Sequence, residues 1–294
     1  MNLFSISQLE QFSGIKAHTI RIWEKRYDAL KPNRSEGNTR YYDNTQLKRL
    51  LNIVSLMDAG HKVSKLCSFS DEKLFEVLNE KLNSSFSDNE TTEYYISQLV
   101  AAGMTYDETH FDATFTNCLN KYGMKDTYLK VIYPLLFRIG LMWANDSMAA
   151  ANDHFISNII KQKLFSTINA LPVAKNHSDT WLLFLPENEF HELSLLFSNY
   201  LIKKAGKKVF YLGANVPIDM LKVSVNQIAP TNLLFFLVHH DLVDDSQNYL
   251  NTLTENFKNS NIHLSGNEKL ISQLKTGEKI EWIRSVQELE DLLK

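Results

Sequence analysis

The sequence predicts a multidomain chain that combines α and α/β structure. Three features of the sequence support this prediction. Two short helical patterns are divided by a glycine turn near the beginning, helical periodicity fills the middle, and apolar runs alternate with helical patterns over the last third. Such alternation is typical of a parallel sheet with helices on both faces. With 294 residues, the chain is long enough for two or three modest domains.

Composition and charge narrow the class of protein. The formal net charge is −3, and the apolar content is ordinary for a globular protein. Lysine and arginine outnumber acids over roughly the first 65 residues, as they do in many nucleic-acid-binding modules. The cysteines, Cys67 and Cys118, are far apart, which excludes a disulfide scaffold and gives no zinc pattern. No apolar run suits a signal peptide or a membrane span, so we expect a cytoplasmic protein without a membrane partner.

Four segments follow one another along the chain. We expect a DNA-binding module over 1–78, a polar linker over 79–92, a helical bundle over 93–175 and an α/β domain over 176–294. Five apolar runs of the last segment predict strands, namely WLLFL, KVFYLG, NLLFFLV, NIHLS and KIEWI. Helical patterns follow at about 190–205, 217–228, 245–258, 267–275 and 285–293. Five such units predict a doubly wound, Rossmann-like sheet of the flavodoxin type.

The first segment has the pattern of a helix-turn-helix. A capped helix begins near Ser5, Gly14 ends it, and a second, basic helix follows. The second helix of such a pair can lie in the major groove. Its spacing places several polar side chains on one exposed face. The next stretch, 31–42, contains Pro, Asn and Gly residues that suit a tight β-hairpin. The exposed helix residues are His18, Thr19, Arg21 and Lys25, and the hairpin adds Arg34 and Arg40, which could reach phosphates.

In their order and spacing, these residues resemble the winged helix-turn-helix of MerR-type transcription regulators. The resemblance covers about 70 residues, from Thr19–Glu24 through Arg34 and Asn38–Tyr42 to Leu47–Leu50. It implies contacts with double-stranded DNA from Thr19, Arg21, Trp23, Lys25, Arg34, Arg40 and Tyr41. For Trp23 a place in the core is an equally good interpretation. One module contacts only a half-site, so we expect a dimer or a higher homo-oligomer.

A histidine between acids lies where the first predicted strand of the last segment ends. The stretch Leu185–Ser194 reads LPENEFHELS, with Glu189 two residues before His191. Open parallel sheets bind ligands at the carboxyl ends of their strands. A carboxylate that holds one ring nitrogen fixes the tautomer of the histidine and raises its basicity as a ligand. The pattern therefore favours a ligand atom aimed out of the sheet, although a solvated loop histidine is the simpler interpretation.

Together with the helical segment, this stretch resembles the cobalamin-binding fold, which pairs a helical bundle with a five-stranded Rossmann-like domain. In that fold, the histidine of an acid-x-His-x-x-Gly motif ligates cobalt from below, so the resemblance implies His191 as the axial ligand of cobalamin, beside Glu189. In the light-responsive regulators that sense adenosylcobalamin, a Trp and an acid–His pair contact the adenosyl group. The matching positions are Trp143, Asp153 and His154, and the tail pocket corresponds to Val238, His239, Ser265 and Gly266.

The chain departs from this pattern at several positions. Ser194 replaces the glycine of the motif, which adds a side chain where the ligand approaches closely. Val238-His239 replaces a serine-containing stretch, Ser265-Gly266 replaces paired glycines, and Asp153 replaces a glutamate. Ala144 follows Trp143, where light-sensing relatives carry a histidine.

Three interpretations remain. The first is a DNA-binding regulator whose C-terminal half senses adenosylcobalamin and thereby light. The second keeps DNA binding, with a C-terminal half that binds no cobalamin and serves oligomerisation or another ligand. The third, an enzyme of the cobalamin-dependent kind, is disfavoured because no residues remain for a substrate domain and no Walker loop or nucleophile elbow is present. We therefore expect a regulator and not an enzyme.

Overall fold

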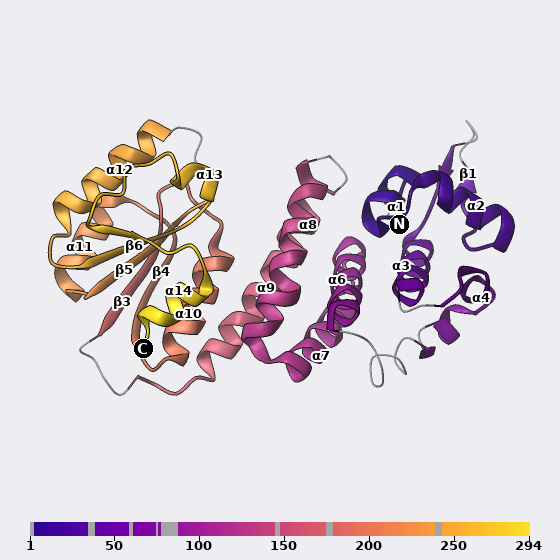
Figure 1. The fold of residues 1–294 in the computed structure, drawn as a ribbon, viewed down its shortest axis with the longest axis horizontal. Helices are drawn as coiled ribbons and strands as arrows, with labels where there is room; N and C mark the ends of the chain where they lie inside the picture. Colours follow the sequence, from indigo (N-terminus) through magenta and orange to yellow (C-terminus); the bar gives the residue numbers. More distant parts are fainter. Residues whose placement is uncertain are drawn as a thin grey trace. The chain divides into compact units, whose positions relative to one another are not determined.

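The computed structural model describes residues 3–34, 39–58, 61–74, 76–77, 88–144, 148–174, 179–238 and 243–294 (Figure 1). The chain forms two compact units, Met1–Ile159 and Ile160–Lys294, and each is described by itself. Within the described ranges, no helix is both long enough and apolar enough to cross a membrane.

The first unit opens with the predicted helix-turn-helix. Helix α1 (Ile6–Ser13) begins with a capping box between Ser5 and Gln8 and ends at Gly14, whose φ of 71° is left-handed. Helix α2 (Ala17–Tyr27) follows after a short turn. The Glu10 side chain accepts hydrogen bonds from the Ala17 backbone N–H at 2.8 Å and from Lys16 at 2.9 Å. This carboxylate therefore fixes the turn and satisfies one of the free N–H groups at the start of α2.

A small hairpin and further helices follow in the part of this module that the structure describes. Strands β1 (Asn33–Arg34) and β2 (Arg40–Tyr41) pair antiparallel. Helices α3 (Asn44–Asp58) and α4 (Val63–Cys67) follow. The core of the module is apolar, and its fully buried members include Leu9, Phe12, Ile20, Tyr42, Leu47 and Leu50.

From residue 88 on, the described residues of the first unit are mainly helical, as the periodicity predicts. Helix α6 (Asp88–Thr105) begins inside the segment that we expected to be a linker. Helix α7 (Glu108–Thr127) is capped by Asp107 and contains a break at Gly123, and a π-helical turn (Tyr128–Ile132) leads into α8 (Tyr133–Ala144). Helix α9 (Ala150–Asn169) continues into the second unit. Gly103 packs closely against Ile156, because a β-carbon added to it would overlap Cδ1 of that side chain.

The second unit is a five-stranded parallel sheet with helices on both faces (Figure 1). Its strands are β3 (Thr180–Pro186), β4 (Lys208–Val216), β5 (Asn232–Leu237), β6 (Asn261–Gly266) and β7 (Ile280–Trp282). Their order in the sheet is β4-β3-β5-β6-β7. The helices are α10 (Glu192–Lys204), α11 (Ile218–Ile228), α12 (Val243–Asn256), α13 (Glu268–Ile271) and α14 (Val286–Leu292). The predicted flavodoxin-type fold is confirmed.

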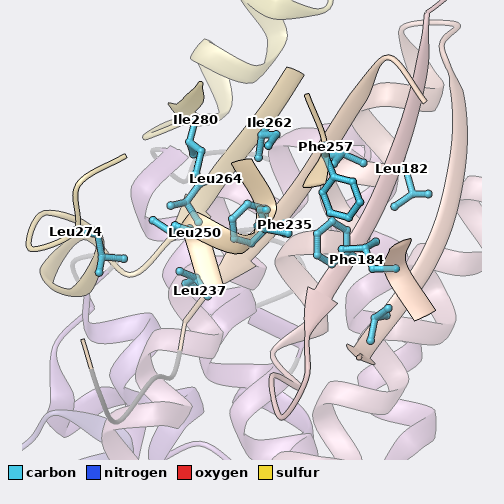
Figure 2. Packing of buried hydrophobic residues seen from close by; sticks show 14 of the residues in the cluster. Leu182, Phe184, Phe235, Leu237, Leu250, Phe257, Ile262, Leu264, Leu274 and Ile280 are labelled. Atoms are coloured by element: carbon cyan, nitrogen blue, oxygen red, sulfur yellow. The ribbon is translucent and has the colours of Figure 1, made fainter. Parts of the chain in front are cut away.

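Successive side chains of each strand point to opposite faces of the sheet, so the apolar core is divided between the two faces. One face packs against α11, α12 and α13, and Figure 2 shows the apolar cluster that it forms. Phe184 and Phe235 stack within this cluster at a centroid distance of 5.5 Å. The other labelled residues of the cluster are Leu182, Leu237, Leu250, Phe257, Ile262, Leu264, Leu274 and Ile280. Because the strands are parallel and covered on both faces, their carboxyl ends carry loops that can hold a ligand.

Candidate functional sites

Helix α2 carries the side chains that the sequence assigns to DNA. His18, Arg21 and Lys25 are exposed and follow one another at helical spacing, so they share one face. Thr19 is partly exposed beside them. Trp23 is only 8 % exposed and lies on the opposite face with Ile20, which agrees with its interpretation as a core residue.

The hairpin holds the other predicted DNA contacts. Arg34 is exposed, and Tyr41 and Arg40 are partly exposed. The Arg40 guanidinium lies 3.2 Å from Oε2 of Glu24, a side chain that is 9 % exposed. Arg40 therefore has a structural role in holding the hairpin to α2, besides any contact with phosphate. Residues 35–38 of the hairpin lie outside the described ranges.

Glu24 joins the hairpin to α2, a role that could not be predicted from the sequence. Its Oε1 atom accepts a hydrogen bond of 2.5 Å from the hydroxyl of the buried Tyr42. Burial, and then the bond to Glu24, raise the pKa of Tyr42, so this hydroxyl stays protonated and donates. The Tyr42 backbone also pairs with Phe4 in both directions, at 2.7 and 2.9 Å. Three segments of the module thus meet at Tyr42.

Helix α3 links this module to the helices that follow within the first unit. Arg49 donates to the carbonyl oxygens of Ala29 at 2.8 Å and Cys67 at 2.9 Å, and pairs with Asp71. On the same helix, the Lys48 ammonium lies 2.7 Å from Asp107 and lowers the pKa of that carboxyl group. The Gln98 side chain donates to Asn52 at 2.9 Å. Sequence spacing alone could not reveal these contacts.

In the second unit, the structure brings Glu189, His191 and Val238 together. The Glu189 side chain is 1 % exposed, whereas that of His191 is 57 % exposed. Oε1 of Glu189 lies 2.5 Å from Nδ1 of His191 and also accepts from the backbone N–H groups of Phe190 and His191. Oε2 accepts from the backbone N–H of Val238 at 3.0 Å. Glu189 therefore fixes the loop after β3 against the end of β5.

Two asparagines with left-handed backbone shape this loop. Asn188 has φ of 66° and Asn215 has φ of 58°, a conformation that asparagine tolerates better than most residues. The Asn188 backbone N–H donates to the Asn215 side chain at 2.9 Å, and the Asn215 backbone N–H donates to the Glu189 carbonyl at 3.2 Å. The end of β4 is thereby joined to the loop after β3 that carries His191. Asn215 is not among the site residues predicted from the sequence.

This arrangement suits a histidine that binds a metal. A carboxylate can only accept at Nδ1, so neutral His191 carries its proton there and its lone pair at Nε2. Nε2 of a neutral imidazole is a common ligand of transition metals, and a carboxylate on the other nitrogen raises its basicity. His191 is also the N-cap residue of α10, so its backbone position is set by the helix. The residues present therefore fit an axial ligand of cobalt.

The other residues predicted to contact the cofactor come from both units of the chain. Ser194 lies partly exposed in the first turn of α10, Ser265 and Gly266 end β6, and Gly266 has φ of 133°. Asp153 accepts from the Ser157 hydroxyl at 3.3 Å, and His154 is exposed, both on the part of α9 in the first unit. His239 and the side chains of Trp143 and Ala144 lie outside what the structure describes. Among the described residues, no three His, Cys, Asp or Glu side chains form a metal cluster.

A polar pocket lies at the opposite, amino-terminal edge of the same sheet. Its volume is about 800 Å³, and its lining includes Asp179, Trp181, Asn232, His263 and Glu281. His263 is 4 % exposed and stacks on Trp181 with a centroid distance of 5.0 Å. This pocket lies at the beginnings of the parallel strands, whereas the His191 loop follows the carboxyl end of β3. The pocket and the His191 loop are therefore at opposite edges of the sheet.

Comparisons with known proteins match two stretches of the chain to known families. Residues 4–66 match the family described as MerR HTH family regulatory protein, and residues 95–165 match the family described as B12 binding domain. The HTH-type transcriptional repressor CarH of Myxococcus xanthus is 25 % identical over 230 residues, which are 77 % of this chain and 76 % of CarH. The repressor CarA of the same organism is 28 % identical over 228 residues, covering 76 % of this chain and 73 % of CarA.

A solved structure supports the fold. The monomethylamine corrinoid protein of Methanosarcina barkeri matches 68 % of this chain and 97 % of its own length with a TM-score of 0.51 at 10 % identity. The expected combination of DNA-binding and cobalamin-type domains is therefore confirmed. The chain is a MerR-type DNA-binding transcription regulator with a B12-binding domain, homologous to the CarH and CarA repressors.

Proposed function

We propose that the chain binds operator DNA through α2 and the β1–β2 hairpin, and that adenosylcobalamin bound through His191 controls this binding. The observation that carries the proposal is the buried Glu189 carboxylate on Nδ1 of His191, which prepares the imidazole as a metal ligand. The similarity to proteins named as repressors supports repression as the direction of control.

On the DNA side, the bases would be read from the exposed face of α2. Arg21 lies on this face and would make a bidentate contact with a base edge, while the exposed Lys25 and Arg34 would contact phosphates. Thr19, His18 and Tyr41 are further candidates at the edges of this surface. A palindromic operator requires two such modules, so we propose a dimer or a higher homo-oligomer.

On the cofactor side, His191 would hold cobalt, with Glu189 orienting the ring. Ser194, Val238, Ser265 and Gly266 are placed at the same edge of the sheet, where the nucleotide tail of the cofactor would lie; His239 belongs to this proposed set by resemblance. Asp153, His154 and Trp143 would contact the adenosyl group. When bound, adenosylcobalamin would supply a cobalt–carbon bond that light can break, and this would make the regulator responsive to light. Ala144 has no atom that can ligate cobalt, so no second protein ligand is expected from that position.

The test combines a spectrum with a DNA-binding assay. The full chain is mixed with adenosylcobalamin in the dark, passed through a gel-filtration column and examined by visible absorption before and after green light. A mobility-shift assay with DNA from upstream of its own gene is run on the same samples. We expect the cofactor to co-elute and the DNA shift to depend on it and on light. A colourless protein that still shifts DNA would favour the alternative, a regulator whose C-terminal half serves oligomerisation or another ligand.

The DNA-binding half has its own test. Arg21→Ala is expected to weaken binding by about 1–3 kcal/mol if the side chain reads a base edge. Lys269→Ala, which removes an exposed lysine in the second unit, is the matched control and should leave the shift unchanged. Affinity should fall steeply with salt because phosphate contacts release counterions.

A further inference from the structure

Glu192 joins two elements next to the candidate cobalt ligand. It is the first residue of α10 and directly follows His191, the N-cap of that helix. Its side chain is 16 % exposed. Oε1 accepts a hydrogen bond of 2.9 Å from the Tyr211 hydroxyl on β4, and Oε2 lies 3.0 Å from the Lys161 ammonium on α9. One carboxylate therefore joins the start of α10 to a strand and to another helix.

The residues around Glu192 pack closely against its carboxylate and against its partner Tyr211. Gly213 has φ of 81°, and a β-carbon added to it would lie 3.0 Å from Oε1, so a side chain there would crowd the carboxylate. Burial, and then the neighbouring Glu192, raise the pKa of Tyr211, which keeps its proton and donates. Phe165, one helical turn after Lys161, packs edge-on against the Tyr211 ring at 6.2 Å and 90°. Two contacts therefore hold α9 to the Glu192–Tyr211 pair.

We infer that Glu192 is a positioning residue for His191 and couples the position of the imidazole to α9. The inference rests on the proposed function, because it concerns the same cobalt ligand. The direction of the His191 ring depends on Glu189, which lies against Nδ1, and on the backbone at the start of α10. Glu192 holds that backbone through Lys161 and Tyr211. Helix α9 carries His154 about two turns before Lys161, so a shift of His191 would reach the helix that bears an expected adenosyl contact.

The experiment reads the ligand of cobalt directly. The full chain is produced with ¹⁵N-labelled histidine, loaded with hydroxocobalamin, reduced to the cob(II)alamin form and examined by electron paramagnetic resonance. An axial ¹⁵N ligand splits the cobalt lines into doublets, whereas the cofactor's own ¹⁴N base gives triplets. We compare the wild type with Glu192→Gln, which can still accept from Tyr211 but lacks the charge that Lys161 needs. Lys161→Met removes the same ion pair from the other side and, being on the surface of a helix, is not expected to disturb folding.

In the wild type we expect doublets from His191. Both variants should keep cobalamin bound but show a ratio of histidine-ligated cobalt to cobalt without a histidine ligand that is lower by about fivefold, the effect of roughly 1 kcal/mol from one partly buried ion pair. Glu187→Gln, which removes an exposed carboxylate from the same loop, is the control and should match the wild type. Doublets of wild-type strength in both variants would overturn the role of Glu192. Absence of bound cobalamin or of doublets in the wild type would instead overturn the proposed function.

Discussion

The hydroxyl group of Tyr42 donates a 2.5 Å hydrogen bond to Glu24, so the residue that follows the hairpin is fixed to the helix proposed to read DNA. The same carboxylate pairs with Arg40, the first residue of β2. Because Tyr42 is fully buried and Glu24 is nearly so, water does not replace either contact easily. The distance between the α2 surface and the hairpin is therefore set inside the module rather than by the DNA.

Tyr42→Phe tests this relationship. Removing the hydroxyl leaves the Glu24 carboxylate without one of its partners, which should lower the free energy of unfolding by about 1.5–3 kcal/mol, the range for bonds to charged groups. DNA affinity should fall as well, because the hairpin is less firmly held. Denaturant unfolding and the mobility-shift assay measure the two effects. Tyr27→Phe, a change at a more exposed tyrosine of α2, is the control, and equal results for both variants would contradict the role assigned to Tyr42.

Glu189→Gln tests the carboxylate that contacts Nδ1 of His191. Glutamine has only one oxygen, so at least one of the N–H groups that now donate to Glu189 would face an amide NH₂ group instead. We expect cobalamin affinity, measured by absorption titration, to fall by about 10–100-fold, as is common when the partner of a metal-ligating histidine is changed. Glu187→Gln should bind as the wild type does. Unchanged affinity in Glu189→Gln would show that the ring is oriented by other groups.

Much of the second unit could be predicted from the sequence, for a physical reason. Strands buried on both faces read as continuous apolar runs, and each of the five predicted runs is a strand of the sheet. The spacing of Glu189 and His191 placed both at the end of β3, and their mutual contact follows from local geometry. Contacts between residues close in sequence can therefore be predicted from the sequence.

Contacts between segments that are far apart in the sequence could not be predicted in this way. Asn215 supports Glu189 because β3 and β4 are neighbours in the sheet, and the order of strands is not visible in local patterns. Glu24 looked like an ordinary helix carboxylate until the fold brought Tyr42 and Arg40 to it. Polar residues at 88–92 resembled a linker, yet they begin α6, because helix formation there depends on packing that the sequence alone does not reveal.

Gly266→Ala tests the close approach of two strand ends. Gly266 has φ of 133°, and a β-carbon added there would overlap the backbone carbonyl of Leu237. Backbone cannot move aside as a flexible side chain can, so we expect a loss of at least about 2 kcal/mol in the free energy of unfolding. Gly277→Ala is the matched control, because Gly277 also has positive φ, 63°, but no atom lies near the added carbon. Thermal and denaturant unfolding should show a clearly larger loss for Gly266→Ala, and equal losses would contradict the overlap.

His263 should make stability depend on pH. Its ring is buried against Trp181, with Nε2 at 3.2 Å from the Asn232 side chain and Nδ1 at 3.1 Å from Glu281. Burial lowers the pKa of His263, and the nearby carboxylates of Glu281 and Asp179 only partly oppose this effect. The unfolded chain therefore binds a proton at a higher pH than the folded chain does. Stability from this residue is fully present above the unfolded pKa, about 6.5, and is lost as the pH falls below it.

The measurement is the free energy of unfolding of the full chain between pH 7 and pH 5, for the wild type and for His263→Phe, which keeps a ring against Trp181 but cannot titrate. The variant should be less stable at neutral pH, because Asn232 and Glu281 lose a partner, but its stability should fall less steeply with acid. A single proton contributes at most about 1.4 kcal/mol per pH unit to the difference in slope. Burial also lowers the pKa of His110 in the first unit. His110→Gln is therefore measured separately, to show how much of the pH dependence comes from His110. Identical slopes for the wild type and His263→Phe would show that His263 does not take up a proton on unfolding in this range.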